Sequence, residues 1–361
     1  MNGRSNLIKR LKAVACVLLA ICFLFCSACG NCDGGNHLEY DNGGGGLGGD
    51  TRSDGNGEVV FDTDGCFSVH FLDVGEGDAI FIDFADGKTM LIDCGEKKER
   101  NLKTIKNCLD EHVTDGTLNY LVLTHPDSDH VGNAVDILTD YKVERAYIPH
   151  LLQPENFNAY KDAHALLLEK EIKTEDSETG KMVYGEDYYL IMLSPENYRN
   201  KDSAYYKVNF SIDPLPDDIN NISPIIYLDY KGVRFIFTGD AGFSQEKVAL
   251  NNIDTGIVNR FLQKQDKVPV NLTDIDFLKV SHHGSNDASG NEFLQRITPK
   301  NAVISVSGTN SYGFPKDETL SRILAANENC NLYLTCKKGT VSVYVNEDGQ
   351  TMIKTAAAMA A

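Results

Sequence analysis

The chain has 361 residues and a formal net charge of −18, with 52 acidic residues against 34 Lys and Arg. This acidic excess argues against tight, sequence-independent binding of DNA, which depends on clustered Lys and Arg side chains that neutralise phosphates. The sequence contains no internal repeat, Walker loop or dinucleotide-binding fingerprint, so we expect no nucleotide cofactor.

The first 28 residues have the layout of an export signal. Basic residues between Arg4 and Lys12 precede an almost unbroken apolar run over 13–27, and Ala28 and Cys29 follow. Such a basic start, apolar run and small residue before the cleavage point are typical of secretion. We expect cleavage before Cys29 and lipid attachment to its thiol, as in bacterial lipoproteins, which places the protein on the outer face of the cell membrane. A plain secretory signal, giving a secreted protein, and an uncleaved anchor are the alternatives.

Residues 29–58 are rich in Gly, Asn and Asp and are predicted to be a flexible tether. Loss of residues 1–28 removes four basic and no acidic residues, so the mature chain carries a net charge of −22. Disulfides are permitted outside the cell. Cys330 and Cys336 are near enough in sequence to pair, although spacing alone does not fix a pairing.

The main domain is predicted to span residues 59–355, followed by a short tail over 356–361. Short apolar runs in this domain predict strands, and longer periodic segments predict helices. Strands are expected over 67–72, 79–84, 89–92, 120–123, 143–148, 233–238 and 277–280, and helices over 99–111 and 132–141. Residues 151–220 have no strong periodicity and are predicted to be an insertion.

Potential metal ligands follow four of these strands. The loop after the strand over 120–123 brings four of them within six residues: His125, Asp127, Asp129 and His130. Two carboxylates and two imidazoles packed so closely are unfavourable unless a cation lies between them. The strands that end near residues 92, 238 and 280 are followed by Asp93, Asp240 and the pair His282-His283. Loops at strand ends along one edge of a layered α/β domain are where such sites are built.

In this order, the residues resemble the metallo-β-lactamase superfamily, and within it the soluble hydrolase-like domain of the ComEC-type competence proteins. The closer match is carried by residues 71–80, 124–132, 237–241, 279–285, 302–306 and 310–313. The resemblance extends from near Cys66 to near Thr355. It implies an α/β fold of the αββα type, in which two mixed β-sheets are flanked by helices and metals lie at one sheet edge.

The resemblance also implies a role for each ligand. Two divalent metal ions would be bound, with His125 and Asp127 on the first, Asp129 and His130 on the second, and Asp240 between them. One histidine of the pair His282-His283 would complete the second site, and the pattern slightly favours His283. The residues expected to support these ligands are Asp93, Asp73, Asp78 and Asn221. Imidazoles and carboxylates without a cysteine suit Zn²⁺ or Mn²⁺.

Two positions depart from the pattern of this branch. Where its members usually read Tyr-Gly-His-Pro-His, this chain has Phe314 and Lys316 in place of the two histidines. Phe314 can neither bind a metal nor transfer a proton. Lys316 could hold a phosphate, or could be a solvated charge at a helix start. Ser285 is the other candidate for substrate binding.

The expected reaction is hydrolysis of a phosphodiester by a metal-bridging hydroxide. Two metal ions lower the pKa of a bound water towards about 7, and they stabilise charge that develops on a phosphoryl oxygen. The candidate catalytic residues are Asp129, which could also orient the water, and His130. The resemblance implies nucleic acid as the substrate class. The alternatives are hydrolysis of another bond, in an envelope phosphoester, a lactone or a β-lactam, and a catalytically degenerate, metal-bound binding protein.

Overall fold

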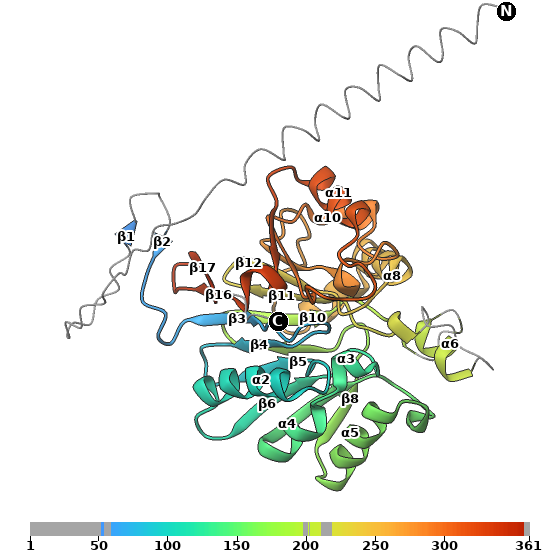
Figure 1. The fold of residues 1–361 in the computed structure, drawn as a ribbon. Coiled ribbons are helices and arrows are strands. Elements are labelled where there is room, and N and C mark those ends of the chain that lie inside the picture. Colours follow the sequence, from blue (N-terminus) through green and yellow to red (C-terminus); the bar gives the residue numbers. More distant parts are fainter. Residues whose placement is uncertain (1–51, 54–58, 198–200, 202, 211–218, 357–361) are drawn as a thin grey trace, which may run out of the picture. The chain divides into compact units, whose positions relative to one another are not determined.

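The computed structural model describes residues 52–53, 59–197, 201, 203–210 and 219–356 (Figure 1). The predicted signal over 1–28, the predicted lipidation site Cys29 and nearly all of the predicted tether lie outside these residues. The short strand Arg52–Ser53 (β1) pairs antiparallel with Val59–Val60 (β2), so two residues of the predicted tether lie in a strand. Within the described residues, no helix combines the length and apolar character needed to cross a membrane.

Two mixed β-sheets form the centre of the domain (Figure 1). The eight-stranded sheet has the order β17-β16-β3-β4-β5-β6-β7-β8, and the seven-stranded sheet has the order β15-β14-β13-β12-β11-β10-β9. The strands of the first are β3 (Phe67–Phe71), β4 (Ile80–Asp83), β5 (Thr89–Ile92), β6 (Thr117–Val122), β7 (Lys142–Ile148), β8 (Lys173–Asp176), β16 (Val341–Val345) and β17 (Thr351–Thr355). Those of the second are β9 (Met182–Tyr184), β10 (Tyr188–Met192), β11 (Ile226–Tyr230), β12 (Val233–Phe237), β13 (Phe277–Lys279), β14 (Asn301–Ile304) and β15 (Asn331–Leu334).

Helices cover the outer face of each sheet. The helices on the eight-stranded sheet are α2 (Glu99–His112), α4 (Ala134–Asp140) and α5 (Asn158–Glu169). Those on the seven-stranded sheet are α8 (Phe243–Asp254), α9 (Ile257–Gln263), α10 (Asn291–Ile297) and α11 (Asp317–Ala326). The other helical segments are α3 (Ser128–Val131), α6 (Ala204–Phe210), α12 (Thr335–Lys338) and the 3-10 turns η1 (Pro154–Asn156) and η2 (Ser281–Gly284).

Alternation along the strands explains this layering. On β3, Phe67, Val69 and Phe71 belong to a hydrophobic cluster that also contains Phe235 and Phe237 of β12, because successive side chains of a strand point to opposite faces. The Phe67 and Phe235 rings lie 5.9 Å apart, so the two sheets contact each other directly. One further hydrophobic cluster lies between the eight-stranded sheet and its helices, and another lies between the seven-stranded sheet and its helices. The predicted αββα arrangement of two mixed sheets flanked by helices is therefore confirmed.

The predicted strands and helices match the observed elements to within one to three residues, whereas the predicted insertion over 151–220 is too broad. Residues 158–192 form α5, β8, β9 and β10, and the three strands pair within the two sheets. β8 and β9 have only three or four residues, and most of their side chains are partly exposed. Strands this short and polar lack the hydrophobic period by which they could be recognised.

The cysteines of the described residues are all free thiols: Cys66, Cys94, Cys108, Cys330 and Cys336. Cys330 and Cys336, whose spacing in the sequence would permit a disulfide, are therefore unpaired. The core of the domain is held by apolar burial instead.

His70 is a buried polar side chain between the eight-stranded sheet and α2. It lies on β3 and faces away from the second sheet. Its ring nitrogens lie 2.9 Å from the Ser68 hydroxyl and 2.8 Å from the Ser342 hydroxyl. The ring of His112, on α2, is 4.8 Å away. Burial, together with neighbouring His112, lowers the pKa of His70 from 6.5 to about 3. His70 is therefore neutral in the folded protein at physiological pH.

We expect His70 to make the protein less stable in mild acid. A histidine whose folded-state pKa is lowered binds its proton mainly in the unfolded state. The free energy of unfolding is therefore unaffected by this proton above pH 6.5 and decreases as the pH falls from 6.5 towards 3. Urea unfolding of wild type and His70→Gln, at matched metal content, should show this. Between pH 7 and pH 5, the free energy of unfolding should fall by about 2 kcal/mol more in wild type than in the variant. Parallel pH profiles would contradict it.

Candidate metal centre

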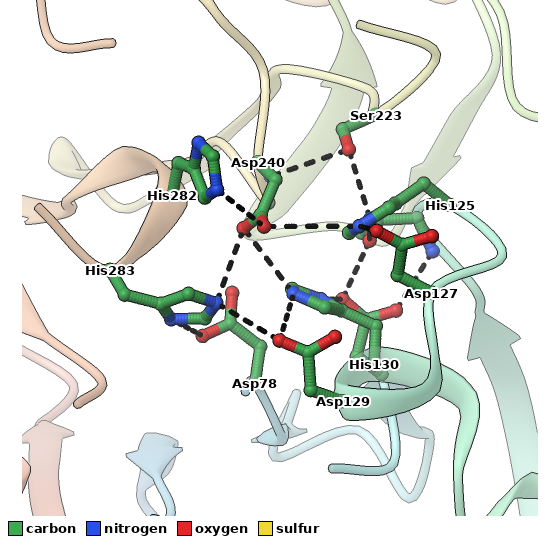
Figure 2. A network of polar contacts seen from close by, with 12 residues as sticks. Asp78, His125, Asp127, Asp129, His130, Ser223, Asp240, His282 and His283 are labelled. Atoms are coloured by element: carbon green, nitrogen blue, oxygen red, sulfur yellow. Dashed lines mark hydrogen bonds and ion pairs between the residues drawn. The ribbon is translucent and has the colours of Figure 1, made fainter. Parts of the chain in front are cut away.

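Side chains from four strand ends meet at one edge of the two sheets (Figure 2). Asp93 follows β5, the 125–130 loop follows β6, Asp240 follows β12, and the pair His282-His283 follows β13. β5 and β6 pair in parallel, as do β12 and β13. The carboxyl ends of parallel strands lie at the same edge of a sheet, so each sheet contributes two loops to the cluster.

The carboxylate of Asp240 lies among four imidazoles (Figure 2). Its Oδ1 is 3.3 Å from Nε2 of His130 and 3.6 Å from Nε2 of His283. Its Oδ2 is 3.8 Å from Nε2 of both His125 and His282. Each oxygen of this one carboxylate thus faces a different pair of histidines.

Two more carboxylates divide the cluster into two groups. The Oδ2 of Asp129 lies 3.5 Å from Nε2 of His283 and 3.9 Å from Nε2 of His130. The Oδ2 of Asp127 lies 3.7 Å from Nε2 of His125. The group at Oδ1 of Asp240 is therefore Asp129, His130 and His283, and the group at Oδ2 is His125, Asp127 and His282. Of the histidine pair, His283 takes the place expected in the second group, while His282 lies beside the first.

The Nδ1 atoms of these histidines are engaged on the side away from Asp240. His130 donates to Asp93 at 2.7 Å, and His283 donates to the Ser305 carbonyl at 2.9 Å. The corresponding contacts of the other two are His125 with the hydroxyls of Thr124 (3.1 Å) and Ser223 (3.2 Å), and His282 with Asp287 (3.2 Å). Such contacts orient the ring and leave Nε2 as the metal-binding atom.

The atoms that face the middle of the cluster lack hydrogen bonds. Nε2 of His125, His130 and His283 and Oδ1 of Asp240 are buried without a hydrogen-bond partner, and only the longer ion-pair contacts given above join them. Buried polar atoms normally have one, and several unpartnered lone pairs converging at one point fit divalent cations. The candidate ligand groupings include His125, His130 and Asp240, and separately Asp129, His130 and His283. With imidazole and carboxylate donors alone, the residues fit Zn²⁺ or Mn²⁺.

The charges of the cluster are strongly coupled. Burial opposes the charged form of His130, but Asp240 and Asp93 raise its pKa well above the usual value. Burial likewise opposes ionisation of Asp240, yet His130 and His283 lower its pKa well below the usual range. At His125, burial and the neighbouring His130 lower the pKa to about 4, so this imidazole is neutral and its Nε2 can bind a metal near pH 7.

Three residues of the site have left-handed backbone conformations. The φ angles are 60° at Asp93, 48° at His282 and 52° at His283. This region costs a residue with a side chain about 1–2 kcal/mol. At the histidine pair, the two successive left-handed residues direct neighbouring imidazoles to opposite oxygens of Asp240. The unfavourable backbone conformation of His282 and His283 is therefore what places their rings on either side of Asp240.

The predicted supporting residues Asp93 and Asp78 lie directly behind the ligands. Asp93 accepts hydrogen bonds from the backbone N–H of Thr124 at 2.8 Å and from its hydroxyl at 2.7 Å, besides that from His130. Asp78 forms a fully buried ion pair with Lys279 at 2.8 Å, and its other oxygen is 3.9 Å from Nδ1 of His283. Sequence reasoning missed Lys279, although a lysine within an apolar strand was a usable signal.

Two other predicted supporting residues lie farther from the ligands. Asp73 forms an ion pair with Arg100 of α2 at 3.2 Å. The side-chain oxygen of Asn221 accepts a hydrogen bond from the backbone N–H of Gly242 at 3.0 Å, which holds the turn after Asp240. Both residues thus position backbone around the site.

The two candidate substrate residues have structural contacts. Ser285 is buried, and its hydroxyl bonds to Asp287, the partner of His282. The Lys316 ammonium donates to the Tyr312 carbonyl and lies 5.4 Å from the centre of the Phe314 ring. Lys316 therefore braces the loop at the edge of the site.

A model of the metallo-beta-lactamase superfamily matches residues 72–190, which include Asp93 and the 125–130 loop. The two mixed sheets of this chain, flanked by helices, have the arrangement expected from this similarity. Two relatives support the resemblance to the competence branch. ComE operon protein 3 of Bacillus subtilis is 27% identical over 312 residues, which are 80% of this chain and 35% of the relative. Recombination protein 2 of Haemophilus influenzae is 25% identical over 259 residues, which are 71% of this chain and 26% of the relative. The chain thus spans about a third or less of each relative's length.

The solved structures to which this chain is similar are distant in sequence. The metallo-beta-lactamase fold protein YhfI from Bacillus subtilis is 10% identical with a TM-score of 0.44, covering 80% of this chain and 99% of that one. Zn(2+)-bound PqqB from Methylobacterium extorquens is 10% identical with a TM-score of 0.43, covering 79% and 99%.

Gly77, in the loop between β3 and β4, tests the dependence of the cluster on close packing. A Cβ at Gly77 would lie 1.9 Å from the carbonyl oxygen of Asp129. We therefore expect Gly77→Ala to displace Asp129 and to lower the bound metal below the two ions per chain expected of wild type, measured by elemental analysis after dialysis against Zn²⁺ or Mn²⁺.

Gly75→Ala is the matched control. Gly75 also has a positive φ, of 74°, but a Cβ there has nothing within 4 Å. It should cost about 1 kcal/mol of stability and keep its metal. Equal metal content in the two variants, or a wild-type chain that binds none, would contradict this account of the site.

Proposed function

We propose that this chain is a metal-dependent phosphodiesterase. The observation that supports it most is the position of Asp240, whose two oxygens each face two imidazole Nε2 atoms. In each of these two pairs, at least one histidine also contacts a further carboxylate, Asp127 or Asp129. Two ligand groups that share one carboxylate suit a pair of divalent ions. When bound, such a pair would supply hydroxide at neutral pH and neutralise the charge that develops on a phosphoryl oxygen.

Asp129 is the residue best placed to act on the substrate side. Its carboxylate contacts the ligand imidazoles of His130 and His283, and it also lines an open hollow of about 480 Å³. Burial opposes its ionisation, but His130 and His283 lower the pKa of Asp129, so it stays an acceptor at neutral pH. Asp129 can therefore hold an attacking water oriented towards a substrate in the hollow, as well as bind metal.

The proposed substrate is a phosphodiester of nucleic acid. Support comes from the similarity to ComE operon protein 3 and Recombination protein 2 over most of this chain. The net charge of −22 after removal of residues 1–28 limits the electrostatic attraction of a polyanion. Short or single-stranded substrates, which need fewer phosphate contacts, fit this charge better than long duplexes.

A second candidate is a metal-bound protein without catalytic activity, which binds a surface ligand. Phe314 stands where the competence branch usually has histidine, and its ring lies edge-to-face on His282 at 5.6 Å. A phenyl ring at this place cannot transfer a proton to a leaving group. The activity test below distinguishes the two candidates.

We expect Asp129→Ala and His125→Ala to abolish turnover, with at least a 100-fold loss of kcat. Asp129 would orient the attacking water, and groups that act in this way contribute about 10²–10⁴-fold, whereas His125 would hold a metal ion that supplies hydroxide. The purified chain, with Zn²⁺ or Mn²⁺, would be tested on bis-p-nitrophenyl phosphate, single-stranded DNA and nitrocefin, and circular dichroism would verify folding. Diester cleavage that depends on both residues supports the proposal. Nitrocefin cleavage alone would favour a lactamase, silence on every substrate would favour the binding protein, and full activity of either variant would overturn the assignment.

We also propose that the domain is held at the outer face of the cell membrane through a lipid on Cys29. The basic start, apolar run and Cys29 of the amino-terminal sequence support this location. In a bacterial host grown with an alkyne-labelled fatty acid, the wild-type chain should take up label and fractionate with membranes, and Cys29→Ala should do neither. Unlabelled wild-type protein found in the medium would show a plain secretory signal instead.

A further inference from the structure

Two stacked aromatic rings extend from the metal centre to the surface. The Tyr312 and Phe314 rings lie 5.4 Å apart with their planes only 15° from parallel. Phe314 in turn meets the ring of His282 edge-to-face at 5.6 Å. At the outer end, Tyr312 is 65% exposed, the most exposed of the large apolar side chains within the described residues. The rings therefore form a continuous path from a candidate metal ligand to solvent.

The loop that carries these rings is held in one conformation by its own hydrogen bonds. The Asn310 amide donates to the carbonyls of Ser307 and Phe314 at 2.8 and 2.9 Å, and its oxygen accepts from the Phe314 N–H at 2.8 Å. The Lys316 N–H donates to the Gly284 carbonyl at 2.8 Å, which ties the loop to the turn that bears the histidine pair. The exposed face of Tyr312 is thus presented by an ordered loop.

Tyr312 and the candidate catalytic Asp129 line the same hollow of about 480 Å³. The hollow is also lined by hydroxyl side chains able to contact a sugar or a phosphate, namely Ser307, Thr309 and Ser311. Its two basic side chains are already ion-paired, Lys98 with Glu96 at 2.5 Å and Arg100 with Asp73 at 3.2 Å. Glu76 and Glu96 line the hollow as well, so the hollow does not bind anions through positive charge alone. An aromatic face, hydroxyl groups and a metal-side carboxylate in one hollow match the base, sugar and phosphate of a nucleotide.

We infer that the Tyr312–Phe314 stack is the base-binding platform of this site, and that it positions an unpaired nucleobase next to the phosphodiester to be cleaved. The inference rests on the proposed function. A base can face the Tyr312 ring only when it is not stacked within a duplex, so the platform selects single-stranded nucleic acid or strand ends. Because the acidic body offers little attraction to phosphates, base stacking provides the affinity that clustered lysines provide elsewhere.

The platform also gives a physical role to Phe314 and Lys316, which replace the two histidines that the competence branch usually has at these positions. Phe314 supports the inner face of Tyr312, and the Lys316 ammonium lies 5.4 Å from the centre of the Phe314 ring while donating to the Tyr312 carbonyl. A histidine at 314 would present a smaller, more polar ring to the stack. The sequence change therefore extends the aromatic surface rather than leaving a gap.

The test compares an oligonucleotide with an abasic strand of the same length. Alanine replacement of a stacking aromatic weakens binding of each stacked base by roughly 5- to 140-fold. For Tyr312→Ala we expect the preference for the base-bearing strand, in KM and in affinity, to fall by this factor, whereas Tyr312→Phe should keep it because the ring remains. Tyr184→Ala, which removes an exposed tyrosine from edge strand β9, is the matched control and should retain the wild-type ratio.

A binding measurement without turnover separates this inference from the proposed function. In an Asp129→Ala background, an oligonucleotide that contains 2-aminopurine should lose fluorescence when its base stacks, and Tyr312→Ala should remove that loss. If base-dependent quenching is observed but the wild-type chain cleaves no diester, the platform is supported and the phosphodiesterase is refuted. If the wild-type chain cleaves diesters but Tyr312→Ala changes neither the quenching nor the base preference, the platform is refuted and the phosphodiesterase is supported. Equal binding of abasic and base-bearing strands, or binding of neither, overturns the inference.

Discussion

The carboxylate of Asp240 and the four imidazoles around it set the conditions that the rest of this structure meets. An ionised group buried this deeply is expensive unless other charges or hydrogen bonds surround it. Here the surrounding groups come from loops separated by more than a hundred residues. The left-handed backbone at His282 and His283, and the hydrogen bonds behind each ring, follow from the need to aim four Nε2 atoms at one carboxylate.

The two sheets hold these loops in place. Asp93 and the 125–130 loop leave the eight-stranded sheet, while Asp240 and the histidine pair leave the seven-stranded sheet. The distance across the cluster therefore depends on how the sheets pack, and that packing is made by aromatic side chains such as Phe67, Phe71 and Phe237. Because such interiors are close-packed and deform little, the apolar layer between the sheets sets the spacing of the candidate metal centre.

The outer side of the site has a different chemistry from its interior. Inside, charge is balanced among imidazoles, carboxylates and the buried Asp78–Lys279 pair. At the rim, an exposed tyrosine and the loop of Asn310 meet a hollow with hydroxyl, basic and acidic side chains. For an acidic protein, recognition through rings and hydroxyl groups is better suited to a nucleic acid than recognition through charge. The rim thus fits the proposed single-stranded substrate, while the net charge disfavours long duplexes.

Much of the fold was readable from the sequence. The strands have local hydrophobic runs, and the ligand-rich loop His125–His130 stands directly after one of them, so local patterning located both. The resemblance to a known family then supplied the expected role of each ligand and the two-sheet arrangement. β8 and β9 were missed because they are short and partly exposed, so that sheet pairing rather than local periodicity makes them strands. β10, a buried apolar run of five residues, did have a local signal.

Only the tertiary structure decided how the neighbours His282 and His283 divide between the two oxygens of Asp240, since that depends on backbone dihedral angles and on a carboxylate some forty residues away. The same holds for the ion pair of Asp78 with Lys279, which joins the two sheets, and for the pairing of the buried Asp73 with Arg100 of α2 rather than with the ligands. The sequence determined which chemical groups this protein has at its strand ends. Long-range packing determined which of them touch, because contacts between distant segments have no local signature in the chain.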